Sequence, residues 1–282
     1  KFPEPFNFKA DDVITDIYGV MYNHYDFYST RKYPLIQYVY PCPQTEAVNK
    51  SFGRGMDRTD RLAQFGFVVV TLGNRGGHPA RSKWYHNYGY GNLRDYGLAD
   101  KKAAVEQLAD RFTFIDRDKV GIHGHSGGGF MSTAAMFAYP DIFKVAVSNA
   151  GNHDNSVYNR WWSEKHNGVK ENISDKGDTT FSYMIDKNPD IAKNLKGKLL
   201  LIHGEIDNNV HPANTLRVVN ALIRANKRFD MLILPTQRHG FGDMSEYWFW
   251  KTADYFSKYL LSDNTERSVD IEELNKEIER KK

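Results

Sequence analysis

The stretch 120–134 reads VGIHGHSGGGFMSTA, and it decides the fold. A short run rich in β-forming residues ends at His123, the turn GHSGG at 124–128 follows, and small and apolar residues then recur at helical spacing. We expect a strand, a sharp turn and a helix, with Ser126 at the apex. A GxSxG turn of this kind strains the serine backbone and lifts the hydroxyl clear of the sheet, while the flanking glycines let strand and helix pack closely. Ser126 is therefore the predicted nucleophile.

Two further strands supply partners for this serine. The apolar run LLLIH at 199–203 predicts a buried strand, and the loop after it carries Asp207. The run MLILP at 231–235 predicts another, followed by a loop with His239. Because the carboxyl ends of parallel strands share one edge of a sheet, we expect the serine, the acid and the histidine to converge there. Their order along the chain is the order found in α/β-hydrolases.

These residue types fit nucleophilic catalysis. A serine hydroxyl is a poor nucleophile at neutral pH, so the imidazole of His239 must take its proton as it attacks. The carboxylate of Asp207 would fix the tautomer of that imidazole and stabilise the imidazolium that forms. The sequence therefore predicts a hydrolase that works through an acyl-enzyme on Ser126. His203 and His211, which flank the acid, are expected to be packing or capping residues.

Composition limits the classes of partner. The 282 residues suffice for one large α/β domain, and Lys and Arg (38) nearly balance Asp and Glu (35), for a net charge of +3. This balance favours neither a nucleic acid nor a membrane surface as a partner, and no apolar run approaches the ~20 residues of a membrane span. The single cysteine, Cys42, excludes an internal disulfide but leaves the compartment open, with a periplasmic or secreted location preferred to the cytoplasm. His78 and His86 lack a second pair of ligands, so no metal or other cofactor is expected.

The rest of the chain alternates strand and helix patterns. Such alternation predicts an α/β-hydrolase fold with a mostly parallel central sheet and helices on both faces. We expect a linker or leading arm over 1–14, a catalytic domain over 15–261 and a charged tail or helix over 262–282. The chain starts KFPEP without a methionine, so we expect a processed product or a fragment of a longer protein. Strands are expected at 15–22, 33–40, 67–72, 119–123, 144–150, 199–203 and 231–235, and helices at 49–64, 95–112, 212–226 and 246–261.

The stretch 73–90 is expected to form a long loop at the edge of the site. It is rich in glycine, aromatic and cationic residues, and long loops of this kind are often functional. Arg75 and Arg81 within it are candidates for contacting a substrate carboxylate or carbonyl. A solvated surface position is the favoured alternative for each.

Four segments together resemble a known family. They are VYPCPQ, which contains Tyr40, then GHSGGGFMS, HGEIDNNVH and QRHGFG, in this order. They resemble the catalytic domain of the prolyl oligopeptidase family of serine peptidases, and most of all its dipeptidyl-peptidase IV branch, with the similarity running from about residue 17 to about residue 261. The resemblance implies triad roles for Ser126, Asp207 and His239. It also implies an oxyanion hole formed by the backbone N–H of Gly127 and the hydroxyl of Tyr40.

A substrate pocket is expected beside the serine. The stretch 151–197 loses regular periodicity, which predicts a lid or pocket-forming excursion whose tryptophans either line the pocket or anchor the excursion. In the resembling branch an aromatic residue usually follows the serine; here that residue is Gly127, and Asp154 stands where a second tyrosine is expected. The resemblance therefore does not imply a strict preference for proline. The substrate-binding candidates are Tyr158, Trp161, Asn209 and Val210.

Three functions remain open at this point. The first is a serine peptidase of dipeptidyl-peptidase type that acts on short peptides. The second is an esterase or other acyl hydrolase, since a triad does not distinguish esters from amides. The third is a catalytically silent domain that binds partners. By the resemblance, a β-propeller that caps the site is expected upstream in a longer parent, because this chain has no internal repeat of its own, and assembly as a homodimer stays open.

Overall fold

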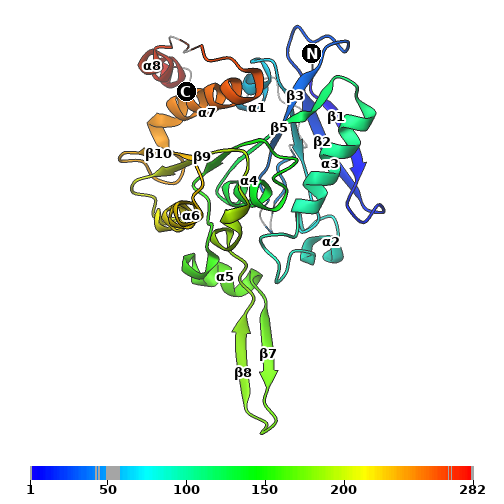
Figure 1. The fold of residues 1–282 in the computed structure, drawn as a ribbon, viewed down its shortest axis with the longest axis vertical. Helices are drawn as coiled ribbons and strands as arrows, with labels where there is room; N and C mark the ends of the chain where they lie inside the picture. Colours follow the sequence, from blue (N-terminus) through cyan, green and yellow to red (C-terminus); the bar gives the residue numbers. More distant parts are fainter. Residues whose placement is uncertain are drawn as a thin grey trace.

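An eight-stranded sheet forms the centre of the molecule (Figure 1). The computed structural model describes residues 2–41, 43, 45–48, 58–265, 267 and 269–280. The strand order is β1-β2-β4-β3-β5-β6-β9-β10, and all neighbours from β4 to β10 are parallel, while β1 pairs antiparallel with β2 and β2 with β4. The strands are β1 (Glu4–Lys9), β2 (Asp16–Tyr22), β3 (Tyr33–Tyr38), β4 (Val68–Leu72), β5 (Ile115–His125), β6 (Val145–Asn149), β9 (Lys198–Gly204) and β10 (Asp230–Leu234).

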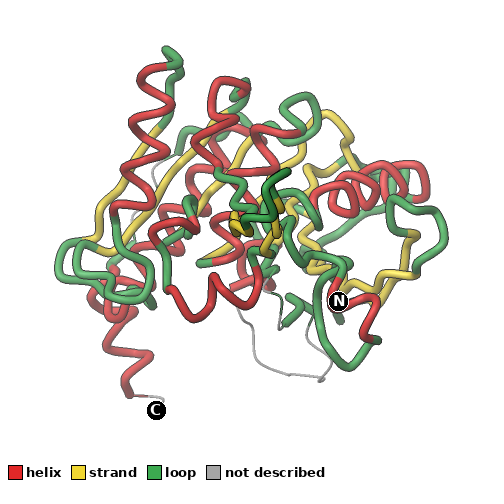
Figure 2. Tube along the Cα trace, turned by 90° about the horizontal axis from the view of Figure 1, so that it is seen from below, coloured by secondary structure: helices red, strands yellow, loops and turns green. Residues whose placement is uncertain are grey.

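Helices cover both faces of this sheet (Figures 1 and 2). One hydrophobic core lies between the sheet and α3, α4 and α6, and a second lies between the sheet and α1 and α7. The predicted mostly parallel sheet with helices on both faces is confirmed. None of the described helices is long and apolar enough to cross a membrane. The helices are α1 (Arg58–Ala63), α2 (Lys83–Asn87), α3 (Leu98–Arg111), α4 (Gly127–Ala138), α5 (Arg160–His166), α6 (Ala213–Arg224), α7 (Ser245–Phe256) and α8 (Ile271–Arg280).

The central strands are buried on both faces. Every residue of β4 (VVVTL) and of β6 (VAVSN) is buried, as parallel strands between two layers of helices require. Full burial of one valine or leucine side chain contributes roughly 1.5–3 kcal/mol, so these continuous apolar runs hold the sheet firmly. The loops that follow β5, β9 and β10 are thereby fixed at the same edge.

The N-terminal segment corrects one expectation. The sequence predicts a linker or leading arm over 1–14, whereas residues 4–9 form β1 and pair with β2 from Glu4↔Met21 to Lys9↔Asp16. Phe6 and Phe8 are buried in the first core, because alternate residues of this edge strand face the sheet interior. The arm is therefore part of the domain.

The C-terminal segment over 262–282, expected as a tail or helix, contains α8 beside α7 (Figure 1). The side-chain amide of Asn275 in α8 donates a hydrogen bond to the backbone oxygen of Asp243. Cys42 and the first part of the helix expected over 49–64 lie outside the described residues.

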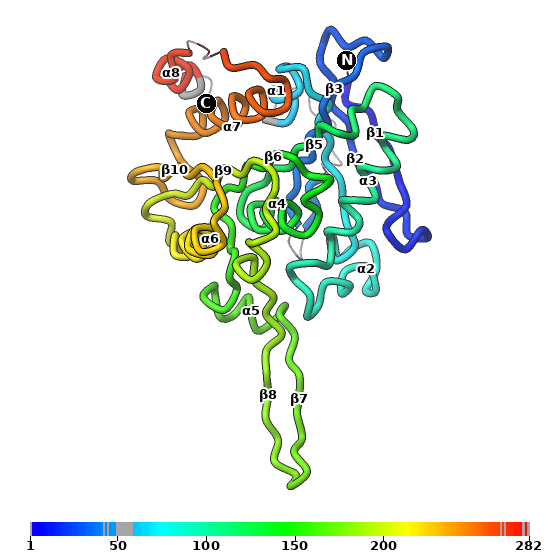
Figure 3. The backbone as a smooth tube through the Cα atoms, in the orientation of Figure 1, coloured from blue at the N-terminus to red at the C-terminus, as the bar shows by residue number. Residues whose placement is uncertain are grey.

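The excursion over 151–197 contains a hairpin that projects far from the domain (Figure 3). Its strands are β7 (Val169–Ile173) and β8 (Thr179–Tyr183), paired antiparallel, with α5 at their base. Ile173 and Phe181 lie on it with 68% and 66% of their surface exposed. The excursion thus joins a pocket-forming part around α5 to an exposed arm.

Candidate active site

Ser126 lies at a sharp turn between β5 and α4, as the sequence predicts. Its backbone has φ 58° and ψ −119°, in the left-handed half of φ space where a residue with a side chain is strained. Close packing explains the neighbouring glycines, since a Cβ at Gly124 or Gly128 would lie 2.2 or 2.1 Å from the backbone oxygen of Val39. Close packing of the glycines before and after Ser126 holds the turn in this strained conformation.

Asp207 and His239 form a hydrogen-bonded pair at the same edge. Asp207 follows β9 and His239 follows β10, and His239 Nδ1 lies 2.7 Å from Asp207 Oδ2. A carboxylate only accepts hydrogen bonds, so Nδ1 carries the proton and Nε2 is left as the basic nitrogen. The acid is buried, whereas the histidine side chain is 22% exposed. This arrangement is that of a general base oriented by a carboxylate.

His125 connects this pair with the serine. Its ring centre lies 4.7 Å from that of His239 and 5.1 Å from that of Phe241. Because His125 directly precedes Ser126, the contact brings the loop after β10 against the turn. The structure thus places Ser126, Asp207 and His239 at the carboxyl ends of three parallel strands, on one edge of the sheet, as the sequence predicts.

The Asp207 carboxylate accepts three hydrogen bonds and has a fourth donor close by. The backbone N–H groups of Asn209 and Val210 each lie 2.9 Å from Oδ1, and His203 Nε2 lies 3.3 Å from Oδ2, in addition to His239. Burial by itself would raise the pKa of Asp207, but the bonds from His203, His239 and Val210 outweigh it and hold that pKa below its ordinary value. The acid therefore stays ionised over the whole neutral range.

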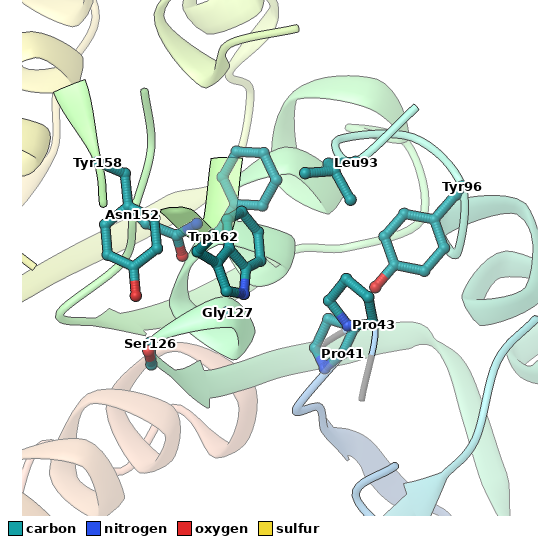
Figure 4. Close-up of a pocket in the computed structure, with 10 residues that line it drawn as sticks. Pro41, Pro43, Leu93, Tyr96, Ser126, Gly127, Asn152, Tyr158 and Trp162 are labelled. Atoms are coloured by element: carbon teal, nitrogen blue, oxygen red, sulfur yellow. The ribbon is translucent and has the colours of Figure 1, made fainter. Parts of the chain in front are cut away.

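An apolar pocket opens beside Ser126 and corrects the choice between the two tryptophans (Figure 4). Trp161 is 76% exposed, whereas Trp162 lines the pocket and contacts the Tyr158 ring edge-on at 5.3 Å. Adjacent residues on a helix point about 100° apart, so only one of them faces the pocket, and the ring contact with Tyr158 identifies it as Trp162. The lining residues are Pro41, Pro43, Leu93, Tyr96, Ser126, Gly127, Phe130, Asn152, Tyr158 and Trp162.

Asn209 and Val210 contribute through their backbones. Neither is among the described residues that line the pocket. The side chain of Val210 is buried, and its substrate contact stays a prediction. The Asn209 side chain is exposed on the acid loop, and its substrate contact stays a prediction.

Gly127 begins α4 directly under the segment that carries Tyr40. A Cβ at Gly127 would lie 2.5 Å from the backbone oxygen of Pro41. The chain just after Tyr40 therefore passes in contact with the start of the helix, where backbone N–H groups point outward. The oxyanion role of Gly127 and Tyr40 stays a prediction that this proximity supports.

The arginines of the 73–90 loop have structural partners. Arg75 is buried, and its guanidinium lies 2.7 Å from Asp100 and 3.1 Å from Asp12, so neither a substrate contact nor a solvated position describes it. Arg81 donates to the backbone oxygen of Asp16 at 2.6 Å. The two arginines fasten the loop to the domain. Within the described part of the chain, no group of three His, Cys, Asp or Glu side chains could hold a metal ion.

Comparison with known proteins identifies a matching family and several relatives. The family model described as "Prolyl oligopeptidase family" matches residues 56–263. Human dipeptidyl peptidase 8 is 34% identical over 239 residues, which cover 84% of this chain and 26% of that protein. Venom dipeptidyl peptidase 4 of Apis mellifera is 27% identical over 83% of this chain and 30% of that protein.

Solved structures agree with these sequence matches. A crystal structure of a candidate dipeptidyl aminopeptidase IV from Bacteroides ovatus superposes with a TM-score of 0.80 at 28% identity, covering 92% of this chain and 36% of that one. Dipeptidyl peptidase 4 of Porphyromonas gingivalis shares the fold, with a TM-score of 0.78 at 24% identity. The chain spans about a quarter to a third of the length of these relatives. The family match and the 34% identity together show that the chain belongs to the prolyl oligopeptidase family of peptidases.

Proposed function

We propose that the chain is the catalytic domain of a serine peptidase of dipeptidyl-peptidase type, which cleaves short units from the amino ends of peptides. The observation that carries the proposal is the Asp207–His239 pair, with the acid held by three hydrogen bonds, beside a strained Ser126 that opens onto an apolar pocket. The names of the relatives support the peptide substrate.

The proposed reaction runs through a covalent intermediate. His239 Nε2 takes the proton of Ser126 as Oγ bonds to the scissile carbonyl carbon, and the backbone N–H of Gly127 and the Tyr40 hydroxyl stabilise the oxyanion. The C–N bond then breaks as His239 returns the proton to the leaving amine. Water, deprotonated by the same imidazole, cleaves the acyl-enzyme and restores Ser126. Asp207 stays ionised and balances the imidazolium throughout.

The pocket supports a small apolar residue on the acyl side of the cleaved bond. Its volume of about 30 Å³ corresponds to roughly two water-sized spheres, and its walls are proline and aromatic side chains. We propose that a small residue such as alanine or proline is preferred there to phenylalanine. We further propose that recognition of the free amino terminus comes from a propeller-type domain outside this chain, as the resemblance implies.

The test is a paired assay on the full-length protein. Chromophore release is measured from Gly-Pro-anilide and Ala-Ala-anilide, each with a free and a blocked amino terminus, with Ser126→Ala as control. Turnover of the free amines alone supports the proposal. Equal turnover of blocked substrates would replace it with an endopeptidase, and hydrolysis of p-nitrophenyl esters without any anilide turnover would replace it with an esterase. If no substrate is turned over, the proposal would be replaced by a binding domain without catalytic activity.

A further inference from the structure

Asp207 lies between two histidines, and only one of them belongs to the predicted triad. The second, His203, is the penultimate residue of β9 and is fully buried. Its Nε2 lies 2.8 Å from the backbone oxygen of Val210 and 3.3 Å from Asp207 Oδ2, the same oxygen that accepts from His239. Its Nδ1 lies 2.7 Å from the hydroxyl oxygen of Thr215 in α6.

The partners of His203 fix its tautomer. The carbonyl of Val210 and the carboxylate of Asp207 only accept hydrogen bonds, so Nε2 carries the proton. The Thr215 hydroxyl then donates to the unprotonated Nδ1. A neutral imidazole with its proton on Nε2 satisfies all three partners, so the ring can stay buried without a charge.

We propose that His203 is a positioning residue for the acid of the triad. Its N–H, shared between Val210 and Asp207, closes the loop that carries the acid and holds Oδ2 toward His239. The same N–H withdraws part of the negative charge from Oδ2, because a hydrogen bond to a carboxylate oxygen disperses its charge. His203 thereby tunes how strongly Asp207 favours the imidazolium form of His239. The inference rests on the proposed function, since it concerns the same catalytic pair.

Other titratable groups in the surroundings are few and identifiable. His153, in the loop after β6, is buried near His203, and burial lowers its pKa to about 3, so it is neutral at the pH of an assay. Its Nδ1 accepts from the amide of Asn188 at 3.0 Å. On the far side of the carboxylate, the ring of His125 contacts that of His239. We expect a pH effect of a His203 substitution to pass through Asp207 and His239.

The test compares variants of His203 with and without a donor. In His203→Leu the donor is lost, more charge remains on Oδ2, and the imidazolium of His239 is favoured. We expect kcat to fall about tenfold with little change in KM, and the acid limb of kcat/KM to move up by roughly half a pH unit. His203→Gln, whose amide N–H reaches the position of Nε2, should restore most of both quantities. Thr215→Val keeps the Nε2 proton and should change kcat less than threefold or so.

Two outcomes would overturn the inference. One is a His203→Leu variant whose pH profile coincides with that of the wild type; the other is equal loss of kcat in the Leu and Gln variants, which would make the role one of packing only. Circular dichroism and thermal unfolding confirm that each variant is folded. Each variant is assayed on a free-amine dipeptidyl anilide and on p-nitrophenyl acetate. If the wild type cleaves only the ester, the proposed peptidase function fails, while the ester profiles still decide the role of His203.

Discussion

Trp162 should set the size of residue accepted on the acyl side of the cleaved bond. Its indole closes one wall of a pocket of about 30 Å³ and packs edge-on against Tyr158. In Trp162→Ala, a substrate with proline or alanine at this position loses contact with the ring face. That loss costs roughly 1–2 kcal/mol of transition-state binding, or about 5- to 30-fold in kcat/KM.

Larger residues should respond in the opposite direction. We expect the small wild-type pocket to disfavour phenylalanine, and removal of the indole opens space for it. We expect the ratio of kcat/KM for a phenylalanyl substrate over an alanyl one to rise at least about tenfold.

Trp161→Ala is the matched control, because the adjacent tryptophan is 76% exposed and does not line the pocket. It should stay within about twofold of the wild type on both substrates. The assay is steady-state kinetics on a series of aminoacyl-alanyl, -prolyl and -phenylalanyl anilides. Equal behaviour of the two variants, or an unchanged selectivity ratio in Trp162→Ala, would refute this account of the pocket.

Three further predictions follow from contacts and burial. Gly127→Ala places a Cβ 2.5 Å from the backbone oxygen of Pro41, so the oxyanion segment must shift and kcat should fall about 100-fold. In the same assay, Gly240→Ala should leave kcat nearly unchanged, because no atom lies within 4 Å of its Cβ. Asp207→Asn removes the charge that stabilises the imidazolium and should lower kcat about 10⁴-fold with the fold intact by circular dichroism, and a loss under tenfold would contradict the triad. Burial lowers the pKa of His123 to about 3, so the unfolded chain binds a proton below about pH 6.5 while the folded ring stays neutral. The free energy of unfolding therefore decreases as the pH falls from about 6.5 toward 3, by about 1 kcal/mol per pH unit. His123→Phe should reduce this dependence, which urea unfolding at pH 5 and pH 7 measures.

Much of the site could be predicted because it depends on local signals. Ser126, Asp207 and His239 each follow a run rich in β-forming or apolar residues, and such runs predict parallel strands whose carboxyl ends share an edge. Chain order then leaves few alternatives for each role. The turn at Ser126 carries its own signature of closely packed glycines.

The features of the site and fold that could not be predicted depend on the direction in which a side chain points, and local sequence patterns carry little information on that direction. Trp161 and Trp162 are adjacent and identical, and only the start of α5 at Arg160 decides which of them meets Tyr158. Arg75 pairs with Asp100, 25 positions away, in a contact that no local pattern indicates. β1 is short and polar in composition, and only the alternation of Phe6 and Phe8 marks it as a strand.

Ser126 is the proposed nucleophile of a peptidase, and covalent labelling examines that role without any choice of substrate. The full-length protein is treated with diisopropyl fluorophosphate, the labelled residue is mapped by mass spectrometry, and dipeptidyl-anilide turnover is followed in parallel. We expect one adduct per chain, on Ser126, with turnover lost in proportion to labelling. An adduct on another residue, or undiminished turnover in fully labelled protein, would contradict it.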